Sequence, residues 1–183
     1  MFVTRISNCF SRLSKVTLKI QPAGPTCLLD QGMFRSSRAD DRDVMGDETM
    51  EKDEAITTAV ETIRAFYTAI VAGDVETMVG LMSPEIEWIS VVDFNIQSRG
   101  PDEVMKKVFV PLMQEWESFS PSPSEFLVDG STVVSLGRFS CVHRATMKRA
   151  DLAYAHVWDV RDGKIERHRQ YIDTLALDQI RRF

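Results

Sequence analysis

The sequence predicts an α+β domain in which helices pack on one face of a curved, mainly antiparallel sheet. In residues 53–116 most apolar side chains recur at helical spacing, whereas in residues 126–174 they alternate with polar ones. The order of elements is helix, helix, strand, helix and then a run of strands. This order is typical of helices gathered on one side of an antiparallel sheet. Residues 51–183 are therefore predicted to form one domain.

The composition narrows the classes of protein to which the chain can belong. It has 183 residues, 44% hydrophobic and 27% charged, which is enough for a packed core. A net charge of -5 argues against a nucleic-acid-binding surface. No apolar run approaches the roughly 20 residues of a membrane helix, so no membrane span is expected. Three widely spaced cysteines without a zinc-binding pattern favour a reducing compartment, hence the cytoplasm.

Residues 1–50 are expected to be a disordered or targeting extension outside the fold. Residues 1–29 carry four basic side chains and no acidic one. This composition suits a transit peptide, which would direct the protein to mitochondria or another organelle. A cluster of helix breakers and a polar run follow, as in a linker. Two alternatives stay open: a plain unstructured tail, or translation that begins at Met45 or Met50.

Two helices are predicted at the start of the domain. Over residues 53–72, steps of four and three residues place these apolar side chains on one helix face: Ile56, Val60, Ile63, Tyr67 and Ile70. Asp53 is expected to cap the start of this helix, and Gly73 to end it. Asp74 then caps a short second helix, which Ser83 and Pro84 end. Its buried side is expected to comprise Val75, Met78, Val79 and Met82.

A strand, a loop and a third helix are predicted next. Residues 85–89 have the pattern of a strand, and the polar residues 93–99 that of a loop. The third helix begins at residues 100–103, where a proline in the first turn is followed by two acidic residues near the positive helix end. Pro111 is expected to kink or interrupt this helix, because proline removes a hydrogen bond and clashes with the preceding turn.

The last part of the domain is predicted to be two hairpins. Residues 126–128 and 132–142 form the first, and residues 150–160 and 164–174 form the second. A three-residue loop ending in glycine is typical of a type I turn with a bulge. That loop pairs Trp158 with Glu166, His156 with His168, and Tyr154 with Gln170. A two-residue loop would instead shift every pairing and change which side chains share a face.

Three segments resemble the SnoaL-like branch of the nuclear transport factor 2-like superfamily, which includes ketosteroid isomerase-like proteins and polyketide cyclases. The segments are AFYTAIVAGDVETMVGLMSPEIEW, RGPDEVMKKVF and AHVWDVRDGKIERHRQYIDT. The resemblance extends over residues 55–177. It implies a cone-shaped barrel, whose bent sheet wraps around the long first helix and encloses an apolar pocket. It also implies a homodimer formed through the sheet.

The resemblance implies a protein that binds a small hydrophobic or carbonyl-containing molecule. Any chemistry would be proton transfer, as in an isomerase or a cyclase, without a cofactor. A non-catalytic ligand-binding or dimerisation module is the alternative from another class, because this fold hosts many functions. An epoxide hydrolase-like enzyme is a third possibility, and it requires Arg138 and two acids around one water.

Three residues of the last segment are the main candidates for chemistry. His156 matches a pocket histidine of the cyclases and is expected to act as acid, base or hydrogen-bond donor. Gln170 stands where the cyclases carry a proton-abstracting aspartate, and an amide can orient a ligand but cannot act as a base. Asp173 matches the acid that ends the cyclase motif, and would either replace that base or cap the end of a strand.

The remaining candidates are expected to bind the ligand or to fill the core. Aromatic walls suit a ring-bearing ligand, and they would be built from Trp88, Phe66, Tyr154 and Trp158. His168 faces the pocket in the predicted register. It has no evident third partner for a metal ion, so no metal site is expected. The isomerase phenol donor and base fall on Phe66 and Ser90, while Tyr67 is expected to point elsewhere.

Overall fold

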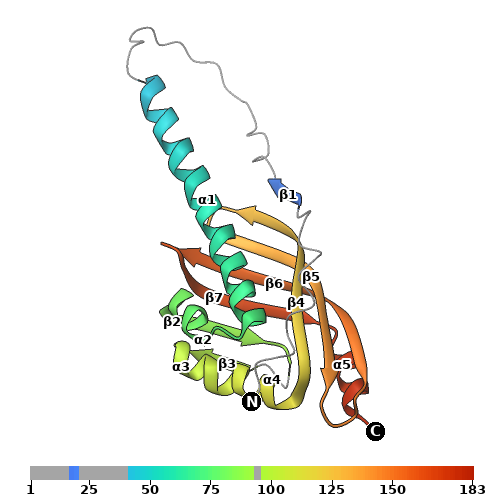
Figure 1. Cartoon of the computed structure of the whole chain (residues 1–183). Helices are drawn as coiled ribbons and strands as arrows, with labels where there is room; N and C mark the ends of the chain where they lie inside the picture. The colour runs from blue at the N-terminus through green and yellow to red at the C-terminus, as the bar shows by residue number, and fades with distance from the viewer. Residues whose placement is uncertain (1–16, 21–40, 93–95) are drawn as a thin grey trace.

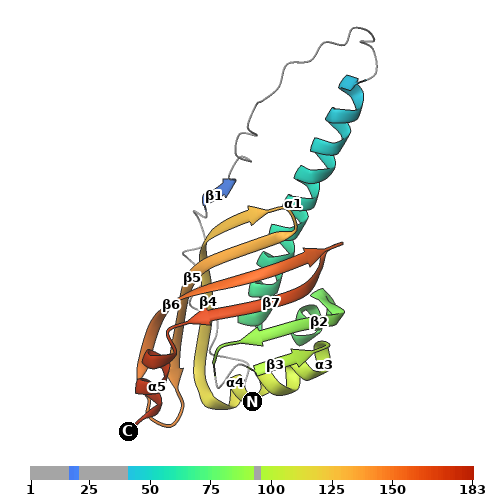
Figure 2. The same ribbon diagram turned by 180° about the vertical axis from the view of Figure 1, so that it is seen from behind.

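The computed structural model describes residues 17–20, 41–92 and 96–183 (Figures 1 and 2). Its strands are β1 (Thr17–Ile20), β2 (Met82–Ser90), β3 (Ile96–Arg99), β4 (Trp116–Asp129), β5 (Thr132–His143), β6 (Arg149–Arg161) and β7 (Lys164–Ile172). Its helices are α1 (Asp41–Ala72), α2 (Val75–Leu81), α3 (Pro101–Val104), the π-helix η2 (Met105–Phe109), α4 (Val110–Glu115) and α5 (Thr174–Arg181). Most of the extension expected in residues 1–50 lies outside the described residues.

The strands form one mixed sheet in the order β1-β4-β5-β6-β7-β2-β3. All neighbours are antiparallel except β1 with β4 and β2 with β7. The sheet bends strongly around α1 but stays open, with β1 and β3 at its edges. Viewed from behind, the strands lie in front of α1 (Figure 2). The α+β prediction and the cone-shaped fold are confirmed.

Helix α1 supplies the centre of the core. Ile63 and Phe66 are fully buried against the sheet, and Tyr67 is nearly so. The helix begins at Asp41, so the expected cap at Asp53 is wrong. By length and composition, Asp53–Ala72 is apolar enough to cross a membrane, contrary to the expectation from the sequence. Burial of one face of α1 in the protein core accounts for this apolar composition.

Helix α2 begins as predicted and ends earlier than predicted. The Asp74 side chain accepts a hydrogen bond from the Thr77 backbone N–H, as an N-cap does. Met78 is buried, but Val75 is 45% exposed and does not belong to the buried side. The helix ends at Leu81, and the chain passes directly into β2.

The segment before the third helix is a strand rather than a loop. Residues 96–99 form β3, which pairs antiparallel with β2, while residues 93–95 lie outside the described residues. Pro111 interrupts the third helix as expected. The turn before it widens into η2, where the Val110 N–H donates to the Met105 carbonyl five residues back. The wider turn leaves room for the proline ring.

Strand β4 is longer than predicted, because it runs through the Ser-Pro-Ser-Pro segment. Pro121 pairs with Phe139 of β5, and Pro123 pairs with Gly137. Strand β1 covers only the Glu125–Val128 part of the other side of β4. Proline is tolerated there because an edge strand has no second ladder of hydrogen bonds to satisfy.

The loop between β6 and β7 has two residues rather than the predicted three. Asp162 and Gly163 both have positive φ, which is the geometry of a type I′ turn, and Arg161 pairs with Lys164. A β-bulge at Glu166 then adds one unpaired residue to β7. The expected pairing is therefore wrong by two residues along most of the hairpin.

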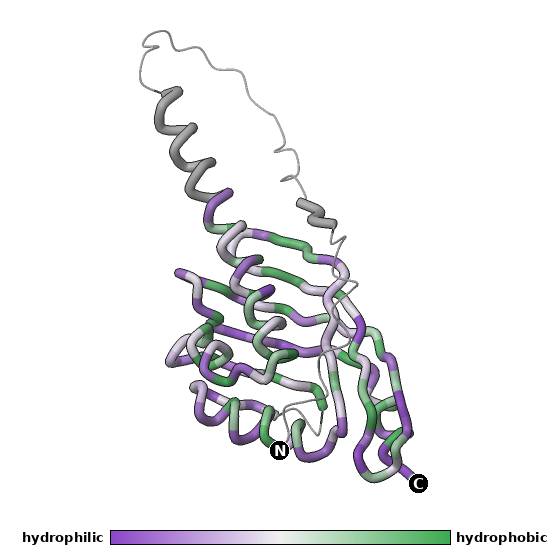
Figure 3. Tube along the Cα trace, in the orientation of Figure 1, coloured by the Kyte–Doolittle hydropathy of each residue, from purple (hydrophilic) through white to green (hydrophobic). Residues whose placement is uncertain are grey.

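The two register shifts cancel in their effect on the faces of the sheet. Past the bulge, Trp158 pairs with His168, and His156 pairs with Gln170. Since side chains alternate with a period of two, a shift of two residues leaves the predicted set on one face. Figure 3 shows the apolar and polar residues interspersed along these strands.

Candidate functional site

A small cavity lies between α1, the sheet, α4 and α5. Its volume is about 100 Å³, and most of its lining is apolar, including Ile70, Leu112 and Phe139. An engineered cavity of roughly 150 Å³ accepts benzene. This cavity therefore suits a molecule no larger than a single six-membered ring.

Four side chains form a buried chain of hydrogen bonds beside the cavity. The Tyr67 hydroxyl lies 2.7 Å from His156 Nδ1 and 2.8 Å from Ser135 Oγ. Trp158 Nε1–H donates to the same Ser135 oxygen at 2.8 Å. Helix α1 supplies the phenol, while β5 and β6 place Ser135 directly opposite His156. His156 Nε2 is buried without a hydrogen-bond partner.

His168 lies against two indole rings. Its ring centroid is 3.7 Å from that of Trp88 and 4.2 Å from that of Trp158. The His156 ring stands edge-on to it at 4.9 Å. Both ring nitrogens of His168 and the Trp88 Nε1 are buried without a hydrogen-bond partner. Buried polar atoms are almost always paired, so these atoms mark a place for a polar group of a ligand or for water.

Burial keeps three titratable groups of the cavity, Tyr67, His156 and His168, neutral at pH 7. It lowers the pKa of His156 to about 3, and it lowers that of His168 well below its usual value. It also raises the pKa of Tyr67, which stays a phenol. In each case the cause is that burial disfavours the charged form. Neither histidine is a strong general base in this state.

Gln170 is held by a neighbouring strand. Strands β2 and β7 run parallel, so that Ser90 lies beside Gln170 and Trp88 beside His168. The Ser90 hydroxyl donates to Gln170 Oε1 at 2.7 Å. This bond orients the amide toward the cavity, which both residues line.

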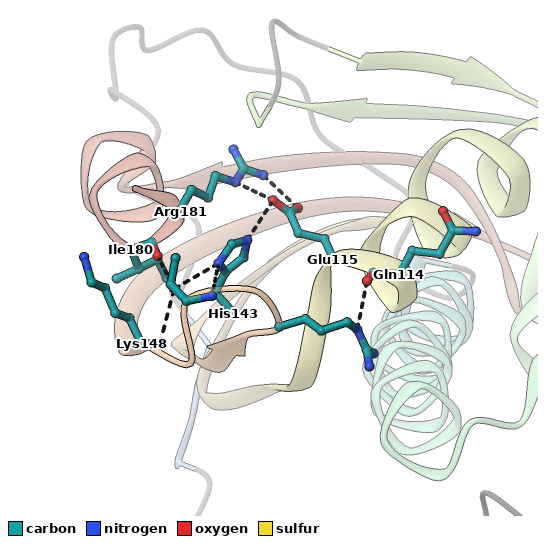
Figure 4. A network of polar contacts seen from close by, with 8 residues as sticks. Gln114, Glu115, His143, Lys148, Ile180 and Arg181 are labelled. Atoms are coloured by element: carbon teal, nitrogen blue, oxygen red, sulfur yellow. Dashed lines mark hydrogen bonds and ion pairs between the residues drawn. The ribbon is translucent and has the colours of Figure 1, made fainter. Parts of the chain in front are cut away.

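A cluster of charged and polar side chains joins α5 to the end of α4 (Figure 4). Arg181 donates two hydrogen bonds to Glu115, at 2.6 and 2.9 Å, and both residues line the cavity. His143 Nε2 lies 4.0 Å from the same carboxylate. Thr146 donates to the Ile180 carbonyl at 2.7 Å. Together these contacts attach α5 to the end of α4 and to the turn between β5 and β6.

The structure brings five of the predicted site residues to the cavity: His156, His168, Gln170, Trp88 and Trp158. Two others lie behind this layer. Tyr154 stacks on His156 with ring centroids 4.1 Å apart, and Phe66 packs on Trp158 at 5.6 Å.

Two predicted site residues lie elsewhere. Asp173 is exposed and caps α5, where its carboxylate accepts from the Ala176 N–H at 3.0 Å. It is not among the side chains that line the cavity. Arg138 is also exposed and pairs with Asp151 at 2.9 Å on the outer face of the sheet. This position rules out the arrangement that an epoxide hydrolase-like site requires.

Sequence reasoning missed Tyr67 as a site residue, although the apolar face of α1 includes it. Tyr67 is 4% exposed and points into the site instead of away from it. Ser135 was missed as well. The signal for it is a serine at an inward position of a strand whose inward neighbours Val133 and Phe139 are apolar. Glu115 gave no signal, because its approach to Arg181 depends on α5, a helix that the sequence analysis did not predict.

The described part of the chain contains no group of three or more His, Cys, Asp or Glu side chains arranged to hold a metal ion. Cys141 is buried, and burial raises its pKa to about 11, which makes its thiol unreactive.

Comparison with known proteins identifies the family. Residues 63–168 match the model of the SnoaL-like domain. The chain belongs to the SnoaL-like family. A nuclear transport factor 2-like protein from Burkholderia thailandensis is similar over 68% of this chain and 98% of its own, with 30% identity and a TM-score of 0.64. A comparison with proteins of curated function finds no significant match.

Two further structures share the SnoaL-like fold at lower identity. A putative SnoaL-like polyketide cyclase from Jannaschia sp. matches with 18% identity and a TM-score of 0.62, over 69% of this chain and 92% of its own. TerC, co-crystallised with polyporic acid, matches with 24% identity and a TM-score of 0.62, over 67% and 97%. At these identities the similarity establishes the fold alone.

Proposed function

We propose that this SnoaL-like domain binds a small, mainly apolar molecule that carries a carbonyl-type oxygen. The observation that carries the proposal is a set of buried polar atoms without partners in a mainly apolar cavity. They are His156 Nε2, the two nitrogens of His168 and Trp88 Nε1. An apolar ligand with one or two hydrogen-bonding atoms would satisfy them, and small-molecule sites have this composition.

The size of the cavity supports a ligand with one ring. A volume of about 100 Å³ leaves no room for a polycyclic molecule without movement of the walls. Trp88 and Trp158 supply aromatic surface to the cavity lining, and the Ser90–Gln170 pair offers a second polar contact.

The same geometry favours binding over proton abstraction. Gln170 cannot accept a proton at neutral pH. Glu115 is the carboxylate among the lining side chains, and Arg181 occupies both of its oxygens. Asp173 lies at the surface. A ligand-binding role without turnover is therefore the leading function, and proton transfer at a carbon next to the carbonyl is the second candidate. The homodimer through the sheet stays a prediction, to be tested by sedimentation equilibrium.

Cyclohexanone is a suitable probe for both candidates. We expect its addition to the full chain to shift the NMR signals of the Trp88, Trp158 and His156 rings in a saturable way. Val108 lines the cavity, so Val108→Phe should abolish these shifts by filling it. The control is Val75→Phe, the same change at a position that is 45% exposed. Equal binding by both variants would refute the cavity as the site.

Catalysis is measured in the same samples. Exchange of the cyclohexanone α-protons for deuterium reports enolisation. Saturable binding with exchange no faster than in buffer indicates a binding protein. Faster exchange that Val108→Phe removes indicates proton-transfer chemistry in the cavity.

A further inference from the structure

The hydrogen-bond chain beside the cavity has a direction that follows from the chemistry of its members. Trp158 Nε1–H is a donor only, so the Ser135 oxygen accepts from it. Ser135 is fully buried, and its side-chain neighbours within hydrogen-bond distance are this indole and the Tyr67 hydroxyl. The serine hydrogen is therefore available to Tyr67.

The Tyr67 hydroxyl accepts a hydrogen bond from Ser135 and is therefore able to donate one to His156. When Tyr67 accepts from Ser135, its own hydrogen points to His156 Nδ1, 2.7 Å away. Each hydroxyl then donates once and accepts once. In the reverse arrangement Ser135 would accept from both Trp158 and Tyr67, and its own buried hydrogen would lose its partner. Leaving a buried donor unpaired is unfavourable. In the first arrangement the hydrogen without a protein partner is on His156 Nε2, and His156 lines the cavity, where a ligand atom or water can accept it. Ser135 is not among the residues that line the cavity, so its hydrogen would stay unpaired in the reverse arrangement, and the first arrangement is the stable one.

We propose that this relay, from Trp158 through Ser135 and Tyr67, holds His156 as the tautomer protonated at Nε2. The cavity then presents a neutral hydrogen-bond donor and selects ligands whose oxygen accepts. The selection rests on the proposed function, whereas the tautomer does not. Tyr67 and Ser135 are positioning residues, because they act through the histidine.

The geometry around the ring supports this assignment. His156 Nε2 is buried and has no protein partner, so the hydrogen it carries is directed to the site and not to another side chain. The Tyr154 ring stacks on the imidazole with centroids 4.1 Å apart, and the Tyr67 ring lies nearly parallel to it at 6.0 Å; these contacts resist rotation of the imidazole. A ring flip would also break the bond from Tyr67.

The consequence is a division of roles between the two histidines. His156 offers a donor whose position is set by the three residues of the relay. His168 has no hydrogen-bond partner at either nitrogen, so its tautomer is free to follow the ligand. Specificity for an acceptor oxygen therefore resides in His156, and the nearby His168 adapts to the rest of the molecule.

The test measures the tautomer directly in the full chain labelled with ¹⁵N-histidine. Two- and three-bond ¹⁵N–¹H correlations distinguish a protonated nitrogen from a bare one, and His156→Gln assigns the signals. We expect Nε2 protonated and Nδ1 bare at pH 7. In Tyr67→Phe we expect a mixture of both tautomers. The control is Tyr171→Phe, which removes a phenol hydroxyl that is 50% exposed on β7, and it should match the wild type.

Cyclohexanone and methylenecyclohexane provide the second readout, because they differ only in the oxygen. In Tyr67→Phe, the preference for the ketone should fall about twofold for each halving of the Nε2-protonated population. Protonation at Nδ1 in the wild type, or an unchanged tautomer in Tyr67→Phe, overturns the proposal. An Nε2-protonated His156 in a protein that binds neither probe overturns the proposed function and leaves the tautomer assignment standing.

Discussion

Glu115 and Arg181 form a two-point ion pair that ties the end of α4 to α5, with oxygen–nitrogen distances of 2.6 and 2.9 Å. Both side chains are partly buried, at 29% and 23% exposed. They also line the cavity. The contact therefore stabilises α5 and forms part of the wall of the site.

Glu115→Gln should loosen α5 without unfolding the domain. The amide keeps the shape but loses the charge, and we expect a loss of about 1 kcal/mol in the free energy of unfolding. Hydrogen exchange should become faster at the amides of α5 before those of the sheet. The control is Glu117→Gln, which removes the exposed partner of Arg144 and should cost less than about 0.5 kcal/mol. Equal effects of the two variants would contradict a special role for Glu115.

Stability should fall when the pH drops below about 6.5. Burial lowers the pKa of His156 to about 3 and also lowers that of His168, so the unfolded chain binds more protons than the folded protein in this range. Each histidine adds a slope approaching about 1.4 kcal/mol per pH unit. Urea unfolding between pH 7.5 and 5 measures this slope, and His156→Gln should reduce it. A stability that does not change over this range would show that the histidines are not buried in neutral form.

Gly137 is required by the close approach of β4, β5 and β6. A Cβ at this position would lie 2.3 Å from the Ser122 carbonyl oxygen and 2.8 Å from Pro123 Cα. Because backbone atoms cannot move aside cheaply, Gly137→Ala should destabilise the protein by about 2 kcal/mol or more.

Gly80→Ala provides the matched control for Gly137→Ala in thermal unfolding. Gly80 is an exposed helical residue with open space around its Cα, and alanine should stabilise the protein by about 0.5–1 kcal/mol. A destabilisation of similar size in both variants would indicate that loss of glycine, and not the strand contact, is responsible.

Asp173→Ala separates a structural role from a catalytic one. Loss of the cap on α5 should lower the free energy of unfolding by about 1 kcal/mol. Binding of cyclohexanone should not change, because Asp173 does not line the cavity. If Asp173→Ala lost cyclohexanone binding while its free energy of unfolding stayed unchanged, Asp173 would have to be part of the ligand site.

The sequence was sufficient for most of the fold, because apolar spacing reports which face of an element is buried. The spacing that identified α1 includes Tyr67, and the alternation in β6 and β7 gathered His156, His168 and Gln170 on one face. The exact pairing could not be predicted, because a bulge such as the one at Glu166 leaves no reliable mark on the sequence. The predicted face was correct only because the shorter turn and the bulge each shift the pairing by one residue, which together leaves every side chain on the same face.

The parts of the site that were missed depend on contacts between distant elements. Tyr67 meets Ser135 and His156 across 68 and 89 residues of sequence. Glu115 meets Arg181 across 66 residues and through α5, a helix that the sequence analysis did not predict. Local periodicity carries no information on such contacts, so the relay and the charged wall emerged only from the structure.

The position of bound cyclohexanone tests the central claim most directly. Nuclear Overhauser effects between its protons and the full-length protein report the nearest side chains. We expect contacts to the rings of Trp88, Trp158 and His156, which line the cavity together. Contacts confined to exposed side chains such as Met147 or Leu175, with none to these rings, would contradict the claim that the cavity is a ligand site.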